Sequence, residues 1–88
     1  DVATAAARIV AGKLLNAGQT CVAPDYALVP EGTVEAFVAA ARRAATARYP
    51  RLVDNGDYTR LVTRRHWERL DALVAEARDA GARVEVVN

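Results

Sequence analysis

The chain has 88 residues, of which 52% are hydrophobic and 26% are charged, and its 12 basic and 11 acidic side chains leave a net charge of +1. This size suits one small domain, and the composition is that of a globular chain rather than a disordered one. The near-zero net charge argues against a dedicated nucleic-acid-binding protein, which normally carries a basic excess. No apolar run reaches the length of a transmembrane helix, so no membrane association is predicted.

Cys21 is the single cysteine of the chain, and methionine is absent. One cysteine cannot form an internal disulfide, so a reducing compartment such as the cytoplasm is predicted. The chain begins with Asp1 and stops directly after a strand-like run. We therefore expect residues 1–88 to be a piece of a longer protein.

The first predicted helix spans residues 2 to about 17. This segment is rich in alanine, and its apolar residues recur at helical spacing around most of the circumference. Gly18 is well placed as the C-terminal cap, because glycine adopts the left-handed conformation without penalty. A helix this apolar needs cover on most sides, so we expect it to pack against further polypeptide or another copy of the chain.

The elements after the first helix are predicted in the order strand, helix, helix and strand, at residues 26–29, 33–49, 63–81 and 83–87. Thr33 and Thr63 suit the N-cap positions of the two helices. Pro50 ends the first of them and Gly81 ends the second, with a turn at residues 54–57 between them. The predicted buried face of the last helix consists of Trp67, Leu70, Val74 and Ala77.

A strand, two helices and a second strand are typical of a right-handed parallel crossover. The predicted fold class is therefore α/β, with three helices and two short strands in the order helix, strand, helix, helix, strand. On its own, a lone cysteine such as Cys21 is most often a small buried hydrophobe. A small α/β structural or interaction module with an inert cysteine is therefore one interpretation of the chain.

A second interpretation comes from resemblance. Residues 8–26, with the sequence RIVAGKLLNAGQTCVAPDY, resemble the catalytic-cysteine segment of the non-phosphorylating aldehyde dehydrogenases. The Gly-Gln-Thr-Cys core at residues 18–21 is most similar to the class 3 branch of that family and to its bacterial coniferyl-aldehyde dehydrogenases. Downstream, residues 28–30 look like the family's next strand. Residues 55–59 look like its Asn-Pro-Asp-Tyr-Thr turn, with Gly56 in place of the proline.

The resemblance implies that residues 1–88 are part of a parallel-sheet catalytic domain with Cys21 as its nucleophile. The Cys21 thiolate would attack the aldehyde carbon to give a thiohemiacetal, and the Cys21 backbone N–H would be one donor to its oxyanion. Hydride transfer to NAD or NADP would leave a thioester, which water converts to the carboxylic acid. Gly18, Gln19 and Thr20 would form the active-site turn, although ordinary turn chemistry also explains Gln19 and Thr20.

The rest of the machinery is expected upstream of Asp1. The chain has no glycine-rich phosphate loop after a strand, so the dinucleotide-binding domain is not expected here. The general-base glutamate and the oxyanion asparagine of the family also belong upstream, and residues 1–88 alone are predicted to be inactive. The choice between NAD and NADP lies outside the chain. The expected partners are an aldehyde, aromatic or of medium chain length, the rest of the same enzyme, and further copies in a homo-oligomer.

Two further features favour ordinary surface roles. His66 is the single histidine and has no cysteine or carboxylate at ligand spacing, so no metal site is predicted. Two runs of arginines suggest a weak nucleic-acid-binding domain as a third interpretation. Pairing of these arginines with nearby acids, such as Arg64 with Glu68 at i,i+4 spacing, instead predicts a solvated face.

Overall fold

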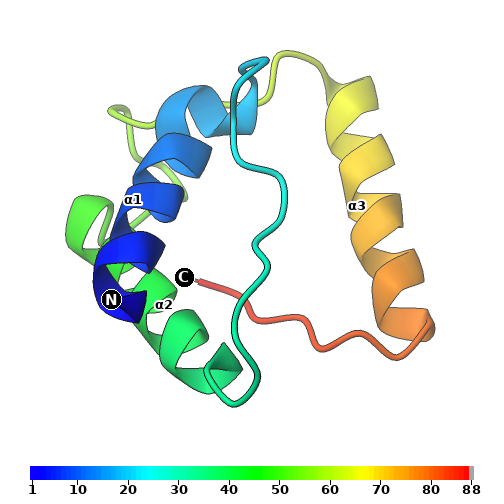
Figure 1. Ribbon diagram of the computed structural model, residues 1–88. Coiled ribbons are helices and arrows are strands. Elements are labelled where there is room, and N and C mark those ends of the chain that lie inside the picture. The colour runs from blue at the N-terminus through cyan, green and yellow to red at the C-terminus, as the bar shows by residue number, and fades with distance from the viewer. Residues whose placement is uncertain (88) are drawn as a thin grey trace.

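The computed structural model describes residues 1–87, and these form helices joined by irregular segments (Figure 1). In chain order the helices are α1 (Val2–Leu14), the short 3₁₀ helix η1 (Leu15–Gly18), α2 (Val34–Arg48) and α3 (Arg64–Asp79). Helices α1 and α2 pack against each other, whereas α3 packs against no other helix of residues 1–87. The described chain is thus a helical pair with a third helix apart from it.

The two predicted strands are absent from residues 1–87, so the predicted α/β class with a parallel sheet is wrong for this part of the chain. A strand is defined by backbone hydrogen bonds to a neighbouring strand, and residues 26–29 and 83–87 do not pair with each other. Leu28 is 91% exposed. Alternation of apolar residues therefore marks segments that suit a sheet, but the described residues supply no sheet for them to join.

Helix α1 begins as its composition predicts and ends earlier than predicted. An Asp1 carboxylate oxygen accepts from the Ala3 N–H at 3.2 Å, and the other accepts from the Thr4 hydroxyl at 2.8 Å. Asp1 is thus the N-cap of α1, and its side chain satisfies one of the free N–H groups of the first turn. The α-helix stops at Leu14 rather than near residue 17, because Leu15 takes an extended ψ of 123°.

The contact between α1 and α2 is made of small side chains. Ala6 of α1 is fully buried, and Ala40 and Ala45 of α2 are 5% and 9% exposed. Alanine lets two helix backbones approach closely, and its methyl group is still removed from contact with water. Part of the cover expected for α1 from further polypeptide or another copy is therefore supplied by α2, although Leu15 just beyond α1 stays 64% exposed.

The ends of α2 follow the prediction in position but not in every contact. The Thr33 hydroxyl donates to the Pro30 carbonyl at 2.6 Å and makes no cap bond to the helix. At the other end the Tyr49 N–H donates to the Ala45 carbonyl at 2.9 Å, and Pro50 follows directly. Proline has no N–H to continue the ladder, so the predicted stop is confirmed.

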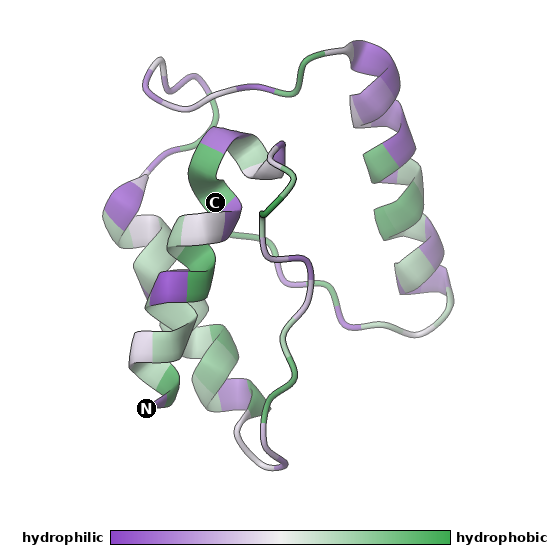
Figure 2. Ribbon diagram, turned by 45° about the horizontal axis from the view of Figure 1, so that its top comes forward, coloured by the Kyte–Doolittle hydropathy of each residue, from purple (hydrophilic) through white to green (hydrophobic). Residues whose placement is uncertain are grey.

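Helix α3 has the predicted ends but not the predicted buried face. The Thr63 hydroxyl accepts from the His66 N–H at 3.2 Å, and Gly81 is left-handed with a φ of 97°. Every residue of α3 is exposed, including Trp67 at 51% and Leu73 at 48%. Figure 2 shows hydrophobic residues on α3 with no helix opposite them. The apolar stripe is real, but within residues 1–87 no helix covers it.

Ion pairs hold the segment at residues 83–87 beside α2. Arg83 donates to both carboxylate oxygens of Glu35, and Arg42 donates to Glu85 at 2.6 Å. The hydrogen bond from Arg83, reinforced by its charge, lowers the pKa of Glu35, and the same contacts raise the pKa of Arg83. These groups are exposed, so the pairs set a position more than they add stability.

Candidate active site

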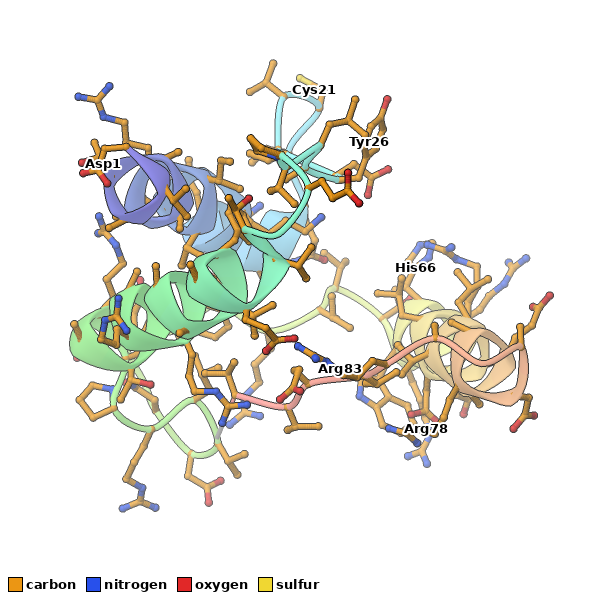
Figure 3. The ribbon with its side chains drawn as sticks, turned by 60° about the horizontal axis from the view of Figure 1, so that its bottom comes forward. Asp1, Cys21, Tyr26, His66, Arg78 and Arg83 are labelled. Atoms are coloured by element: carbon orange, nitrogen blue, oxygen red, sulfur yellow. The ribbon has the colours of Figure 1, made fainter. Side chains whose placement is uncertain are left out.

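Cys21 lies in a tight turn directly after η1. The Ala23 N–H donates to the Thr20 carbonyl at 3.1 Å, so Cys21 and Val22 are the two central residues of the turn. The Cys21 side chain is exposed and projects from the outer edge of the described residues (Figure 3). The exposed thiol does not fit the interpretation that Cys21 is an inert buried hydrophobe.

Three successive left-handed residues lead into this turn. Asn16, Ala17 and Gly18 have φ values of 51°, 55° and 78°. Glycine takes this conformation freely, but for alanine it costs roughly 1–2 kcal/mol. The Gln19 N–H donates to the Asn16 carbonyl at 3.0 Å, and the Asn16 side chain donates back to the Gln19 carbonyl at 3.2 Å. The chain therefore reverses sharply just before Cys21, and Gly18 confirms the predicted left-handed position.

The segment after Cys21 returns to α1. A Cβ on Gly12 would lie 3.2 Å from Pro24 Cδ and 3.3 Å from Pro24 Cγ, which is tighter than an ordinary contact. Glycine at this position lets the proline ring approach the helix backbone. Lys13 also faces Asp25 at 3.9 Å, although both side chains are exposed. The cysteine turn is thus attached to the same helical unit before and after Cys21.

The side chain of Gln19 joins the turn to a distant segment. Its Nε2 donates to the Arg60 carbonyl at 3.0 Å, and its Oε1 accepts from the Val62 N–H at 3.0 Å. The same Nε2 donates to the Asn16 carbonyl at 3.0 Å. The sequence placed Gln19 in the active-site turn but did not indicate residues 60–62 as its neighbours, because their separation of about forty positions carries no local signal.

Residues 60–62, to which the Gln19 side chain is hydrogen-bonded, are themselves held by the loop before them. The rings of Tyr49 and Tyr58 meet edge to face, with centroids 4.8 Å apart. Asn55 donates to the Arg51 carbonyl at 2.7 Å and accepts from the Asp57 N–H at 2.9 Å, which confirms the predicted turn at residues 54–57. Burial raises the pKa of Tyr58, and the neighbouring Tyr49 adds to the shift. This loop ties residues 60–62 to the end of α2.

Comparison with known proteins identifies the segment. A sequence model described as the aldehyde dehydrogenase family matches residues 1–87. The chain belongs to the aldehyde dehydrogenase family. It is 52% identical over 88 residues to a probable coniferyl aldehyde dehydrogenase of Caulobacter vibrioides, which covers 100% of this chain and 18% of that protein. A coniferyl aldehyde dehydrogenase of a Pseudomonas species is 44% identical over the same length and with the same coverage.

More distant relatives share the same stretch. A 4,4'-diaponeurosporen-aldehyde dehydrogenase of Staphylococcus aureus is 38% identical over 78 residues, which are 88% of this chain and 17% of that protein. The chain therefore spans about 18% of the length of the curated relatives with which it aligns in full. No solved structure matches it. The predicted resemblance to aldehyde dehydrogenases is confirmed at the level of the family.

The backbone at Cys21 leaves a hydrogen-bond donor open among the described residues. Within residues 1–87, no group accepts a hydrogen bond from the Cys21 backbone N–H. A donor left open beside a nucleophile can bind the oxygen that gains charge when a carbonyl is attacked. Gly18 and Gln19 shape the approach to Cys21, whereas Thr20 contributes its carbonyl to the turn.

The larger described hollow does not contain the cysteine. It has a volume of about 750 Å³ and lies between the loop before α3 and the start of α3, with Ala17, Tyr58, Leu61 and Trp67 among its lining residues. Cys21 is not in its wall, so a molecule in this hollow would not lie against the thiol. The hollow instead lies beside the segment that Gln19 holds.

Neither a metal site nor a membrane span is found in the described part of the chain. Residues 1–87 contain no group of three or more histidine, cysteine or carboxylate side chains that could hold a metal ion. His66 lies on α3, apart from the segment that carries Cys21 (Figure 3). None of the helices described has both the length and the hydrophobicity that crossing a membrane requires.

Proposed function

We propose that residues 1–88 are the nucleophile-bearing part of the catalytic domain of a longer aldehyde dehydrogenase, which oxidises an aldehyde to the carboxylic acid. The observation that carries this proposal is the exposed Cys21, at the centre of a turn fixed on both sides, in a chain that aligns in full with two coniferyl aldehyde dehydrogenases. A presented thiol on a braced loop is what covalent catalysis at a carbonyl carbon needs.

The first chemical step uses this chain's own atoms. The Cys21 thiolate attacks the aldehyde carbon, a sulfur–carbon bond forms, and the carbonyl π electrons move to the oxygen. The open Cys21 N–H is one donor for the resulting oxyanion, because it lies on the residue that carries the sulfur. A pre-aimed donor of this kind is worth roughly 10²–10³ in rate.

Later steps need groups outside these residues. The described residues contain no glycine-rich phosphate loop, so they do not themselves fit a nicotinamide dinucleotide. NAD or NADP, bound elsewhere in the enzyme, would accept the hydride, and a glutamate outside the chain would activate the water that releases the acid. Residues 1–88 alone are therefore proposed to be inactive, with the dinucleotide-binding domain in another part of the protein.

The names of two relatives suggest the class of aldehyde. Two proteins that align over the full chain, at 52% and 44% identity, carry names that specify coniferyl aldehyde. We therefore propose an aromatic aldehyde of the coniferyl type. We also propose that the exposed apolar face of α3 packs on the rest of the same enzyme, and that the enzyme forms a homo-oligomer. The proposed compartment is the cytoplasm, where a single unpaired cysteine stays reduced.

The test is Cys21→Ser in the full-length enzyme, with coniferyl aldehyde and either nicotinamide cofactor. Turnover should fall by at least about a thousandfold, since loss of a covalent nucleophile removes the reaction path. The circular dichroism spectrum should not change, because the side chain is exposed. Thr46→Ala, on the exposed face of α2, is the control and should keep full turnover. A serine variant within a few-fold of the parent enzyme would show that Cys21 is not the nucleophile.

A further inference from the structure

We propose that Gln19 is a positioning residue, which fixes the Cys21 turn against residues 60–62 so that the thiol keeps the geometry that attack on an aldehyde requires. This inference rests on the proposed function of Cys21. It assigns to the Gln19 side chain a role that the turn alone does not need, because the turn is already closed by backbone bonds from Gln19 to Asn16 and from Ala23 to Thr20.

The contacts of the Gln19 carboxamide are unusually complete. Both of its N–H groups have acceptors, the carbonyls of Asn16 and Arg60, and its oxygen accepts from Val62, all at 3.0 Å. Among residues 1–87, no other side chain of residues 18–23 makes a hydrogen bond to a distant segment. Gln19 is therefore the polar connection between the turn and the rest of the described chain.

The two groups that Gln19 binds outside the turn belong together. The Arg60 carbonyl and the Val62 N–H flank Leu61, and both face one carboxamide. These are the groups that one residue of a neighbouring parallel strand would bond. The side chain thus takes the place of a strand neighbour. A shorter side chain could not span the distance, and an apolar one could make neither bond.

The support that Gln19 reaches is firm. Residues 60–62 follow a loop that is pinned to the end of α2 by the ring contact of Tyr58 with Tyr49 and by the two Asn55 bonds. Thr20 alone separates Gln19 from Cys21, so a shift of Gln19 passes almost directly to the sulfur. A displacement of about 1 Å at a reacting group can lower a rate by roughly a hundredfold.

The contacts also predict that losing this link would not unfold the protein. The atoms that Gln19 binds lie at the surface, where water can replace its hydrogen bonds. The consequence should appear in where the thiol sits and how often it is correctly placed. A positioning role and a merely structural one are therefore separable by experiment.

The experiment uses the full-length enzyme with two variants. Gln19→Met keeps the length of the side chain but removes its donors and acceptor, and Gln19→Asn keeps the chemistry but is one methylene too short to reach residues 60–62. Thr33→Val is the matched control, because it also removes a hydrogen bond from a side chain to the backbone, in the segment before α2. The measurements are kcat, KM, the rate of Cys21 alkylation by iodoacetamide, and hydrogen exchange at the Val62 amide.

Both Gln19 variants should lower kcat and the alkylation rate by about ten- to a hundredfold, with KM within about threefold of the parent value. The Val62 amide should lose protection while the melting temperature stays nearly constant. Thr33→Val should leave alkylation unchanged. Alkylation and kcat within twofold of the parent in both Gln19 variants would overturn the proposal, as would an equal loss in Thr33→Val.

The two proposals fail in different ways. If Cys21→Ser keeps its turnover, the assignment of the nucleophile is wrong, and the alkylation rates still decide whether Gln19 sets the thiol. If Cys21→Ser is inactive and the Gln19 variants react like the parent, the positioning role alone is wrong.

Discussion

The helical pair α1–α2 and the helix α3 have similar sequence signals and opposite surroundings. Both regions have apolar residues at helical spacing, yet Ala6 in the pair is fully buried while Trp67 and Leu73 on α3 are 51% and 48% exposed. The difference shows that periodicity identifies which face of a helix will be covered, but not which partner covers it. Helix α2 covers part of α1, whereas no helix of residues 1–87 covers α3.

The cysteine turn belongs to the covered region. It follows α1 through η1, Pro24 brings it back against Gly12, and Gln19 ties it to a loop that leaves α2. Helix α3 contributes to the hollow beside that loop but carries none of these contacts. Cys21 is therefore placed by the part of the described chain that has its own packing.

The most sensitive test of this difference in packing between α1–α2 and α3 is amide hydrogen exchange on the isolated 88-residue chain. Amides of α1 should exchange at least about a hundredfold more slowly than those of α3, a difference of roughly 2.7 kcal/mol in opening free energy. In the full-length enzyme the amides of α3 should become protected, because we propose that its apolar face is covered there. Equal exchange of α1 and α3 in the isolated chain would remove the distinction between the two regions.

The same substitution in each region gives a second test. Ala6→Leu places a large side chain in the fully buried contact with α2 and should lower the free energy of unfolding by about 1–3 kcal/mol. Ala75→Leu on exposed α3 should change it by no more than about 0.5 kcal/mol. Chemical denaturation of both variants measures the difference. A similar loss for both would mean that α3 is packed after all.

The sequence predicted the helices well because their signals are local. Thr63 caps α3, Pro50 ends α2, and residues 54–57 form a turn, all through contacts within a few positions. The strands were predicted wrongly because a strand depends on a neighbour. Residues 83–87 have the right alternation, but ion pairs to α2 hold them where no strand of the described chain lies beside them.

In the candidate site, too, the local features were predicted and the long-range contacts were not. Cys21 and the Gly18–Thr20 turn were predicted from a contiguous motif, and the family match confirms the resemblance that singled them out. The contact of Gln19 with Arg60 and Val62 was not predicted, because about forty residues separate its two sides. The Asn55 turn, just before that segment, was the nearest available signal.

The smallest expected effect concerns the ion pairs that hold residues 83–87 on α2. Arg83 lowers the pKa of Glu35 in the folded chain below its usual 4.5. A lowered pKa means that the contribution is fully present above the unfolded value and is lost as the pH falls through the folded one. Acid below about pH 4.5 should therefore release residues 83–87 from α2 while the α1–α2 contact, which is apolar, persists.

Hydrogen exchange and side-chain NMR of Arg83 between pH 3 and pH 7, with the unfolding midpoint recorded in parallel, would follow this release. The double variant Glu35→Gln, Glu85→Gln removes the acids of both ion pairs and should free the segment at all pH values. Glu31→Gln, on an exposed acid before α2, should leave the pH response of the segment unchanged. If residues 83–87 stay in place in the double variant, the ion pairs do not hold them. The segment would then be positioned by the half-buried Val84 and Val87, as part of the covered region.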